Sequence, residues 1–174
     1  SVAAMNTQKI LSREELISRA RALVPEIRAH QEKTEAERGV SDEIFAKLTD
    51  AEIFKILLPR RYGGFEHGLD TFVDIGYEIA RGCGSVGWVH SVCAMYHAFL
   101  GMFPGQAQDE VWGENPRAVI AASFTPTGHA TPVDGGYALS GTWMYCSGMD
   151  NCPWIIVAAN LPTQDADGNS AKGY

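Results

Sequence analysis

The stretch Gly84-Ser-Val-Gly-Trp-Val-His-Ser-Val-Cys-Ala-Met-Tyr-His-Ala-Phe-Leu-Gly-Met-Phe103 is the part of the sequence that decides the fold. It contains no Asp, Glu, Lys or Arg, and its length raises the question of a membrane span. However, His90, Ser91 and His97 interrupt its apolar run, and its small residues suit close packing against other protein segments. We therefore expect a buried helix inside a helical bundle, and no membrane association.

The residues before this stretch predict further helices. Ser12-Arg-Glu-Glu15 is a capping-box pattern, and a helix should follow it to about Lys33. Pro25 removes one backbone donor from that helix. Other helix starts are expected at Ser41, Asp70 and Ser85, and a short helix is expected from Gln106 to Trp112.

The residues after the stretch predict a change to strands. Val119 to Phe124 is typical of a buried strand, and Asp134-Gly-Gly136 is a hairpin turn signal. The fold class is therefore α+β, with an N-terminal α-helical domain over 1–116 and the first part of an antiparallel β-domain over 117–174. The other expected strands are Thr131–Val133, Tyr137–Leu139, Thr142–Cys146 and Trp154–Ala159.

Composition and charge exclude some classes of function. The net charge is -7, and the densest basic cluster is Arg60-Arg61, so no stripe for nucleic-acid phosphates is visible. The N-terminal residues Ser1 to Met5 are too short and uncharged for a signal peptide. The four cysteines show no C-x-x-C spacing. We expect reduced thiols and a cytoplasmic protein.

Three segments carry a resemblance to a known family. They are Arg81-Gly-Cys-Gly-Ser-Val-Gly-Trp-Val-His90, Ala122-Ser-Phe-Thr-Pro-Thr-Gly-His-Ala130 and Asp134-Gly-Gly-Tyr-Ala-Leu-Ser-Gly-Thr-Trp-Met-Tyr-Cys-Ser-Gly148. Their order and spacing resemble the acyl-CoA dehydrogenase superfamily. The resemblance is strongest to the oxygenase components of two-component flavin-dependent monooxygenases, which hydroxylate p-hydroxyphenylacetate or steroid-derived phenols.

The resemblance implies an architecture of three parts. These are an N-terminal helical domain, an antiparallel β-barrel-like middle domain and a C-terminal four-helix bundle. This chain would hold the first part and about half of the second, so we expect the bundle to be missing and the chain to be an N-terminal fragment. The full-length relative would be a homotetramer.

The resemblance also assigns residues to a flavin. Ser147 matches the position whose hydroxyl contacts flavin N5, in the triplet Tyr145-Cys146-Ser147, where dehydrogenases usually have Trp-x-Thr. The alternative is a serine in a turn before Gly148. Ser123, Phe124 and Thr125 match the strand that lies along the isoalloxazine, although Pro126 alone would also explain a strand-to-turn junction there.

Four residues of the apolar helix are candidates for the substrate pocket. Trp88 matches a position that approaches flavin and substrate, although a buried Trp is as often part of a core. His90 and His97 share a helix face, and relatives place a histidine on this helix to receive the substrate's phenolic proton. The ungapped register puts Tyr96 at that place, with His97 adjacent, so both are candidate catalytic residues beside Ser147. No metal site is expected, because His90, Cys93 and His97 on one rigid helix seldom converge on an ion.

The leading hypothesis is therefore the oxygenase component of a two-component monooxygenase. A separate flavin reductase would deliver FMNH2 or FADH2, O2 would react to a C4a-hydroperoxide, and a small substrate, with aromatic compounds as first candidates, would be hydroxylated. An FAD-dependent acyl-CoA dehydrogenase or oxidase is the alternative. The carboxylate base of such an enzyme would lie in the C-terminal bundle. The lack of a candidate base in this sequence therefore does not distinguish the two hypotheses. The third hypothesis is a truncated product that acts as a binding or assembly module and not as an enzyme.

Overall fold

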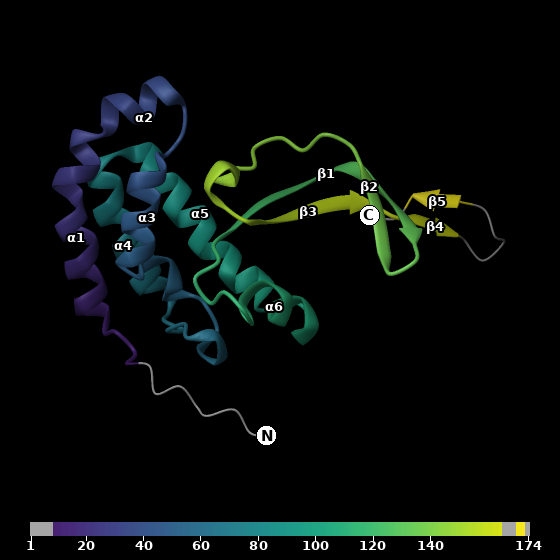
Figure 1. Cartoon of the computed structure of the whole chain (residues 1–174), viewed down its shortest axis with the longest axis horizontal. Coiled ribbons are helices and arrows are strands. Elements are labelled where there is room, and N and C mark those ends of the chain that lie inside the picture. The colour runs from purple at the N-terminus through teal and green to yellow at the C-terminus, as the bar shows by residue number, and fades with distance from the viewer. Residues whose placement is uncertain (1–8, 165–169, 173–174) are drawn as a thin grey trace.

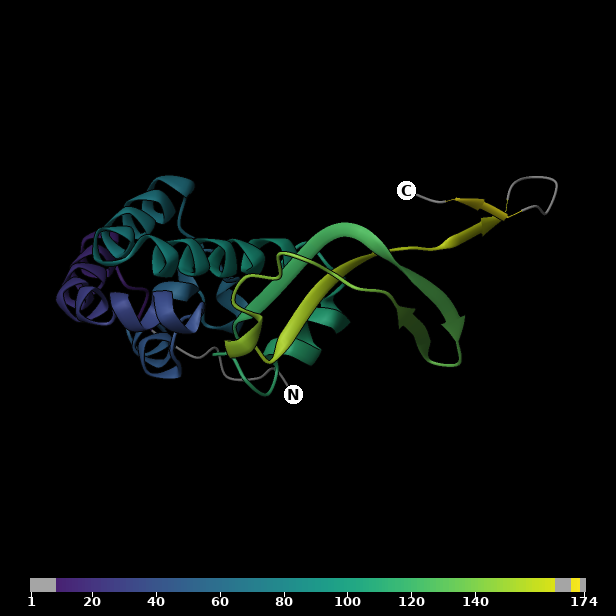
Figure 2. The ribbon, with the colours of Figure 1, turned by 90° about the horizontal axis from the view of Figure 1, so that it is seen from above.

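The structure, a computed structural model, describes residues 9–164 and 170–172. Figure 1 shows the helices gathered at one end of the molecule and the strands extending from them as an arm. Seen from above, this arm curves away from the helices (Figure 2). Among the described residues, the last α-helix, α6 (Gly105–Trp112), ends before the first strand, β1 (Ile120–Val133), begins. This order confirms the α+β fold class, whereas the domain division at 116 stays a prediction.

The first two helices form the outer part of the helical layer. Helix α1 (Arg13–Ala29) begins with the expected capping box, in which Ser12 accepts from the Glu15 amide and Glu15 accepts from the Ser12 amide. The expectation that it continues to Lys33 is wrong. It ends at Ala29, and α2 (Gln31–Glu37) starts a new axis after a turn at His30.

Helix α3 (Asp42–Asp50) starts at the expected cap, because the Ser41 hydroxyl accepts from the Ile44 amide. Two short 3-10 helices, η1 (Ile53–Ile56) and η2 (Arg60–Tyr62), follow it. All three apolar residues of η1 are buried, so this short segment lies inside the helical layer.

Helices α4 (Leu69–Gly82) and α5 (Gly84–Leu100) are packed together. Their close approach depends on Gly87, where a Cβ atom would lie 2.7 Å from the Cα of Ala80. The expected caps at Asp70 and Ser85 are wrong, because the N-cap positions are Gly68 and Cys83 and neither makes a side-chain cap. Within the described part of the chain, no helix has both the length and the apolar character needed to cross a membrane.

The sheet is mixed. Strand β1 pairs antiparallel with β2 (Gly136–Ser140) through the expected hairpin turn, in which Val133 lies opposite Gly136. On its other side, β1 pairs in parallel with β3 (Trp154–Asn160), so the expectation of a wholly antiparallel sheet is wrong. The reason is the long connection over 141–153, which returns the chain to the start of β1; a parallel pair needs a crossover of about a dozen residues. Beyond this sheet, β4 (Pro162–Gln164) and β5 (Ser170–Lys172) form an antiparallel pair.

The expected strand from Thr142 to Cys146 is not formed. Side-chain hydroxyls of β1 occupy backbone carbonyls of this segment, since Ser123 Oγ donates to Met144 O at 2.7 Å and Thr127 Oγ1 donates to Thr142 O at 2.7 Å. The segment is therefore held against β1 without a backbone ladder, and it ends in η3 (Met149–Asn151).

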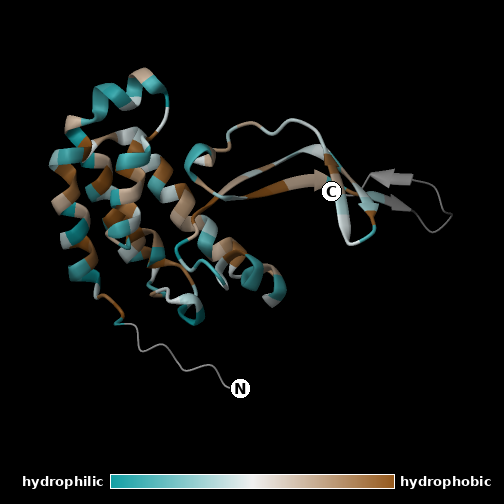
Figure 3. Cartoon of the chain, viewed as in Figure 1, coloured by the Kyte–Doolittle hydropathy of each residue, from teal (hydrophilic) through white to brown (hydrophobic). Residues whose placement is uncertain are grey.

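The hydrophobic core lies mainly among the helices, as the brown inward faces of α1, α3, α4 and α5 indicate (Figure 3). A second cluster joins α5 and α6 to the start of β1. Its buried members are Leu58, Leu100, Val111, Trp112, Ala118 and Ile120.

Leu100→Asp should unfold the protein or make it insoluble. Leu100 is 3% exposed in this second cluster, and an unpaired carboxylate buried there costs several kcal/mol. Soluble yield and thermal unfolding followed by circular dichroism measure the effect. Met102→Asp is the matched control, because Met102 is 73% exposed and should accept the charge. Normal melting of Leu100→Asp would show that this face is not core.

Candidate functional site

Helix α5 divides its candidate residues between two faces. Trp88 lies on the outer side with 63% of its surface exposed, and Tyr96 is half-buried. His90 and His97 lie on the inner side and are 0% and 2% exposed. The sequence assigned all four to one pocket, but the structure does not bring the two histidines to the side that carries Trp88.

Trp88 and Ser147 are brought together although they are far apart in the sequence. The indole Nε1–H of Trp88 donates to Ser147 Oγ at 3.1 Å. Both side chains keep solvent access, since Trp88 is exposed and Ser147 is half-buried. A serine hydroxyl has one donor and two acceptor positions, so Ser147 keeps its hydrogen and one lone pair for a further partner.

The position of Ser147 is set by the turn that follows it. Gly148 has a φ of +85°, and a Cβ there would lie 2.7 Å from the Sγ of Cys93, so a side chain would meet both backbone strain and a clash. Cys93 Sγ–H points to the carbonyl of Ser147 at 3.9 Å. Tyr145, two residues earlier, also has a positive φ, of 58°, and is 86% exposed.

The β1 candidates differ in their surroundings. Ser123 is buried, and its hydroxyl is used to hold Met144 in place. Phe124 and Thr125 are exposed, at a place where the β1–β3 register shifts between Ser123 and Gly128. Such an irregularity interrupts the pairing and changes the direction of the exposed side chains.

An aromatic cluster links α5 to β1. The ring of Phe124 lies 5.6 Å from that of Tyr96, edge to face, and 5.0 Å from that of Phe99. Burial raises the pKa of the Tyr96 phenol, with the neighbouring thiols Cys93 and Cys146 adding to the effect. Tyr96 is therefore a neutral hydrogen-bond donor near pH 7. The sequence did not single out Phe99, whose only signal was its position three residues after Tyr96 on the helix.

The two histidines attach α5 to η1. His90 Nε2 donates to Ile53 O at 3.1 Å, and His97 Nδ1 donates to Phe54 O at 2.8 Å. Burial lowers the pKa of both imidazoles to about 4, so both are neutral at pH 7. Their sequence positions, three or four residues from Cys93, already matched the spacing of the helix's buried face.

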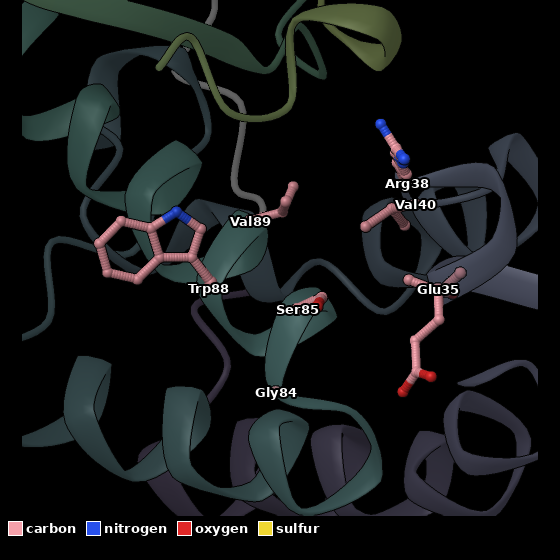
Figure 4. A pocket seen from close by; sticks show the side chains of 9 residues that line it. Glu35, Arg38, Val40, Gly84, Ser85, Trp88 and Val89 are labelled. Atoms are coloured by element: carbon pink, nitrogen blue, oxygen red, sulfur yellow. The ribbon is translucent and has the colours of Figure 1, made fainter. Parts of the chain in front are cut away.

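A pocket of about 580 Å³ lies beside Trp88 (Figure 4). One wall comes from the start of α5 and the other from α2 and the turn after it, which the sequence did not connect with the site. Glu35 and Arg38 give this second wall one charge of each sign. The lining residues are Thr34, Glu35, Arg38, Gly39, Val40, Gly84, Ser85, Trp88 and Val89.

Among the residues that the structure describes, no three or more His, Cys, Asp or Glu side chains gather in a way that could hold a metal ion. The four cysteines are free thiols. The polar groups at the exposed face of α5 are therefore the hydroxyls of Ser147 and Tyr96 and the indole N–H of Trp88. Such a set can hold a flat, partly polar ring, with apolar contacts to its faces and single hydrogen bonds to its edge.

Comparison with known proteins identifies the class. The helical layer and mixed sheet superpose on the crystal structure of the HsaA monooxygenase from M. tuberculosis with a TM-score of 0.85 and 34% identity, over 92% of this chain and 43% of that one. A structure of XiaF from Streptomyces sp. in complex with FADH2 and glycerol gives a TM-score of 0.84 at 29% identity, over 91% and 40% of the two chains. The fold is thus that of the N-terminal part of flavin-dependent monooxygenases.

Sequence comparison gives the family. The acyl-CoA dehydrogenase N-terminal domain matches residues 12–113, and the chain belongs to this family. It is 38% identical over 135 residues to the oxygenase subunit HsaA of a Mycobacterium tuberculosis flavin-dependent monooxygenase, covering 78% of this chain and 34% of that protein. The oxygenase component of an FADH(2)-dependent resorcinol hydroxylase from Rhizobium sp. is 36% identical, with coverages of 86% and 36%. The chain spans about a third of the length of these curated relatives.

Stability should fall as the pH drops from 6.5 to 5.5. The unfolded chain has histidine pKa values of about 6.5 and binds protons in this window, whereas His90 and His97 stay neutral when folded. The loss should be about 1 kcal/mol for each histidine, measured by urea unfolding at both pH values.

Single replacements should remove about half of this pH dependence. His90→Gln keeps a donor near the Nε2 position, and His97→Asn keeps one near Nδ1. His129→Gln is the control, because His129 is exposed on β1 and should leave the dependence unchanged. Equal stability of the unchanged protein at pH 6.5 and 5.5 would contradict the neutral buried state of both imidazoles.

Proposed function

We propose that this chain is part of the oxygenase component of a two-component flavin-dependent monooxygenase. The observation that carries the proposal is the Trp88–Ser147 hydrogen bond. It places an accessible hydroxyl next to an exposed aromatic surface, in a chain similar to oxygenase components of known monooxygenases. Bound reduced flavin, as FMNH2 or FADH2, supplies the electrons that activate O2.

The residues present fit the edge and the faces of a flavin ring. Ser147 can donate to or accept from flavin N5, because Trp88 occupies only one of its lone pairs. Trp88, Phe124 and Tyr145 are exposed aromatic side chains that can lie against the ring. Thr125 and Cys146 complete the candidate contacts, while Ser123 acts on the site indirectly by holding Met144.

Each residue then has a defined task. Ser147 holds the N5 proton, whose loss would release hydrogen peroxide in place of product. Tyr96, Phe99 and Phe124 exclude water from the reacting side of the ring. His90 and His97 are left out of the proposal, because both are buried against η1 and neutral.

The substrate is proposed to be a small aromatic compound. The aromatic cluster suits a flat apolar ring, and the neutral Tyr96 phenol can donate one hydrogen bond to it. The relatives include oxygenase components of a resorcinol hydroxylase and a p-hydroxyphenylacetate 3-hydroxylase. A separate flavin reductase, a homotetrameric whole protein and a cytoplasmic location complete the proposal.

Ser147→Ala should uncouple the reaction without abolishing flavin binding. The ring keeps its apolar contacts, so the affinity for reduced flavin should fall by about the 0.5–1.5 kcal/mol of one hydrogen bond. The share of consumed O2 that appears as hydrogen peroxide should rise strongly. Anaerobic flavin titration and the ratio of peroxide to hydroxylated product, both in the whole protein, measure the two effects.

Two further variants make this test specific. Trp88→Phe keeps an aromatic ring but removes the indole N–H, so it should uncouple partly by releasing Ser147. Ser140→Ala, on the exposed β2 strand, should change neither quantity. Full coupling in Ser147→Ala would mean that Ser147 is not the N5 partner. Oxidation of an acyl-CoA by a protein that purifies yellow, with tightly bound FAD, would favour the dehydrogenase alternative.

A further inference from the structure

Two thiols meet beneath the turn that carries Ser147. Cys93 Sγ of α5 lies 4.0 Å from Cys152 Sγ, which follows η3. Cys93 is buried and Cys152 is half-buried. The missing side chain of Gly148 makes room for Cys93, because a Cβ there would lie 2.7 Å from Cys93 Sγ, whereas its 3.9 Å distance to Cys152 Sγ would be an ordinary contact.

We propose that Cys93 and Cys152 are a peroxide-sensitive dithiol whose disulfide cross-links the Ser147 turn to α5. A disulfide bond is about 2.05 Å long, so the two sulfurs must approach by about 2 Å. The two sulfurs already lie 4.0 Å apart, and Cys152 is the more accessible of the two.

The chemistry balances with hydrogen peroxide as the oxidant. The Cys152 sulfur attacks one peroxide oxygen, the O–O bond breaks, and Cys152 becomes a sulfenic acid while one water is released. The Cys93 sulfur then attacks the Cys152 sulfur, its S–H proton leaves with the hydroxyl group as a second water, and the S–S bond forms. Two thiols are oxidised by two electrons, and one peroxide is reduced to two waters.

The two sulfurs differ in how they can react. Cys152 has solvent access, so it is the sulfur that peroxide reaches first. The contact with Cys152 and burial both raise the pKa of Cys93, which keeps it protonated. Because the thiolate is the nucleophile, this makes the second, resolving attack by Cys93 the slow step. The pair should therefore respond slowly, to sustained peroxide.

Oxidation would act on the candidate flavin edge. Cys93 S–H is the group that points to the Ser147 carbonyl, and the disulfide removes this donor. It also ties the turn to the helix that carries Trp88. Peroxide released by unproductive turnover would be the nearest oxidant, and in this respect the inference rests on the proposed function.

The test is disulfide mapping after treatment of the whole, flavin-free protein with hydrogen peroxide. The protein should lose the mass of two hydrogens, and digestion without reductant should give one peptide pair joined through Cys93 and Cys152. Hydrogen exchange of the amides from 146 to 152 should become several-fold slower, and dithiothreitol should reverse both changes. Neither measurement uses flavin, so a failure here and a failure of the proposed function are distinguishable.

Variants identify the pair. Cys152→Ser should abolish the cross-link and the change in exchange, and Cys93→Ala should do the same. Cys146→Ser is the matched control, since Cys146 is also half-buried and adjoins the same turn, and it should form the cross-link normally. A cross-link through Cys146, overoxidation of Cys152 without any disulfide, or unchanged exchange in the oxidised protein would each overturn the proposal.

Discussion

The structure depends on the packing of α5 on two sides at once. On its inner side, His90 and His97 donate to the Ile53 and Phe54 carbonyls, so both neutral rings hold η1 against the helix. Elsewhere on its surface, the exposed Trp88 and the buried Cys93 contact the turn at Ser147, within the long connection between β2 and β3. A shift of α5 would therefore alter the helical core and the candidate site together.

This arrangement explains how a site can form between a helix and a segment without regular structure. The residues before Ser147 form no backbone ladder, and hydroxyls of β1 hold their carbonyls instead. Gly148 then turns the chain directly over Cys93. The hydroxyl of Ser147 is thus positioned by contacts on both sides while it keeps free hydrogen-bonding capacity, which is what recognition of a ring edge requires.

The sulfur pair and the hydroxyl belong to the same small region. The turn that presents Ser147 is bounded by Gly148 and by Cys152, and both lie against one thiol of α5. In the proposed function, Ser147 would therefore lie within one turn of the two thiols that we propose hydrogen peroxide oxidises. This proximity would allow oxidation of the Cys93–Cys152 pair to alter the proposed flavin contact of Ser147.

The sequence by itself determined the fold class, the helices capped by Ser12 and Ser41, and the β1–β2 hairpin, because capping groups and turn glycines act over a few residues. Motif similarity also pointed to Ser147 and Trp88. Only the tertiary structure decided that β3 runs parallel to β1, that His90 and His97 face η1, and that Cys93 meets Cys152. Those outcomes depend on how distant segments pack, and a local pattern cannot indicate which face of a helix without charged residues will meet which partner.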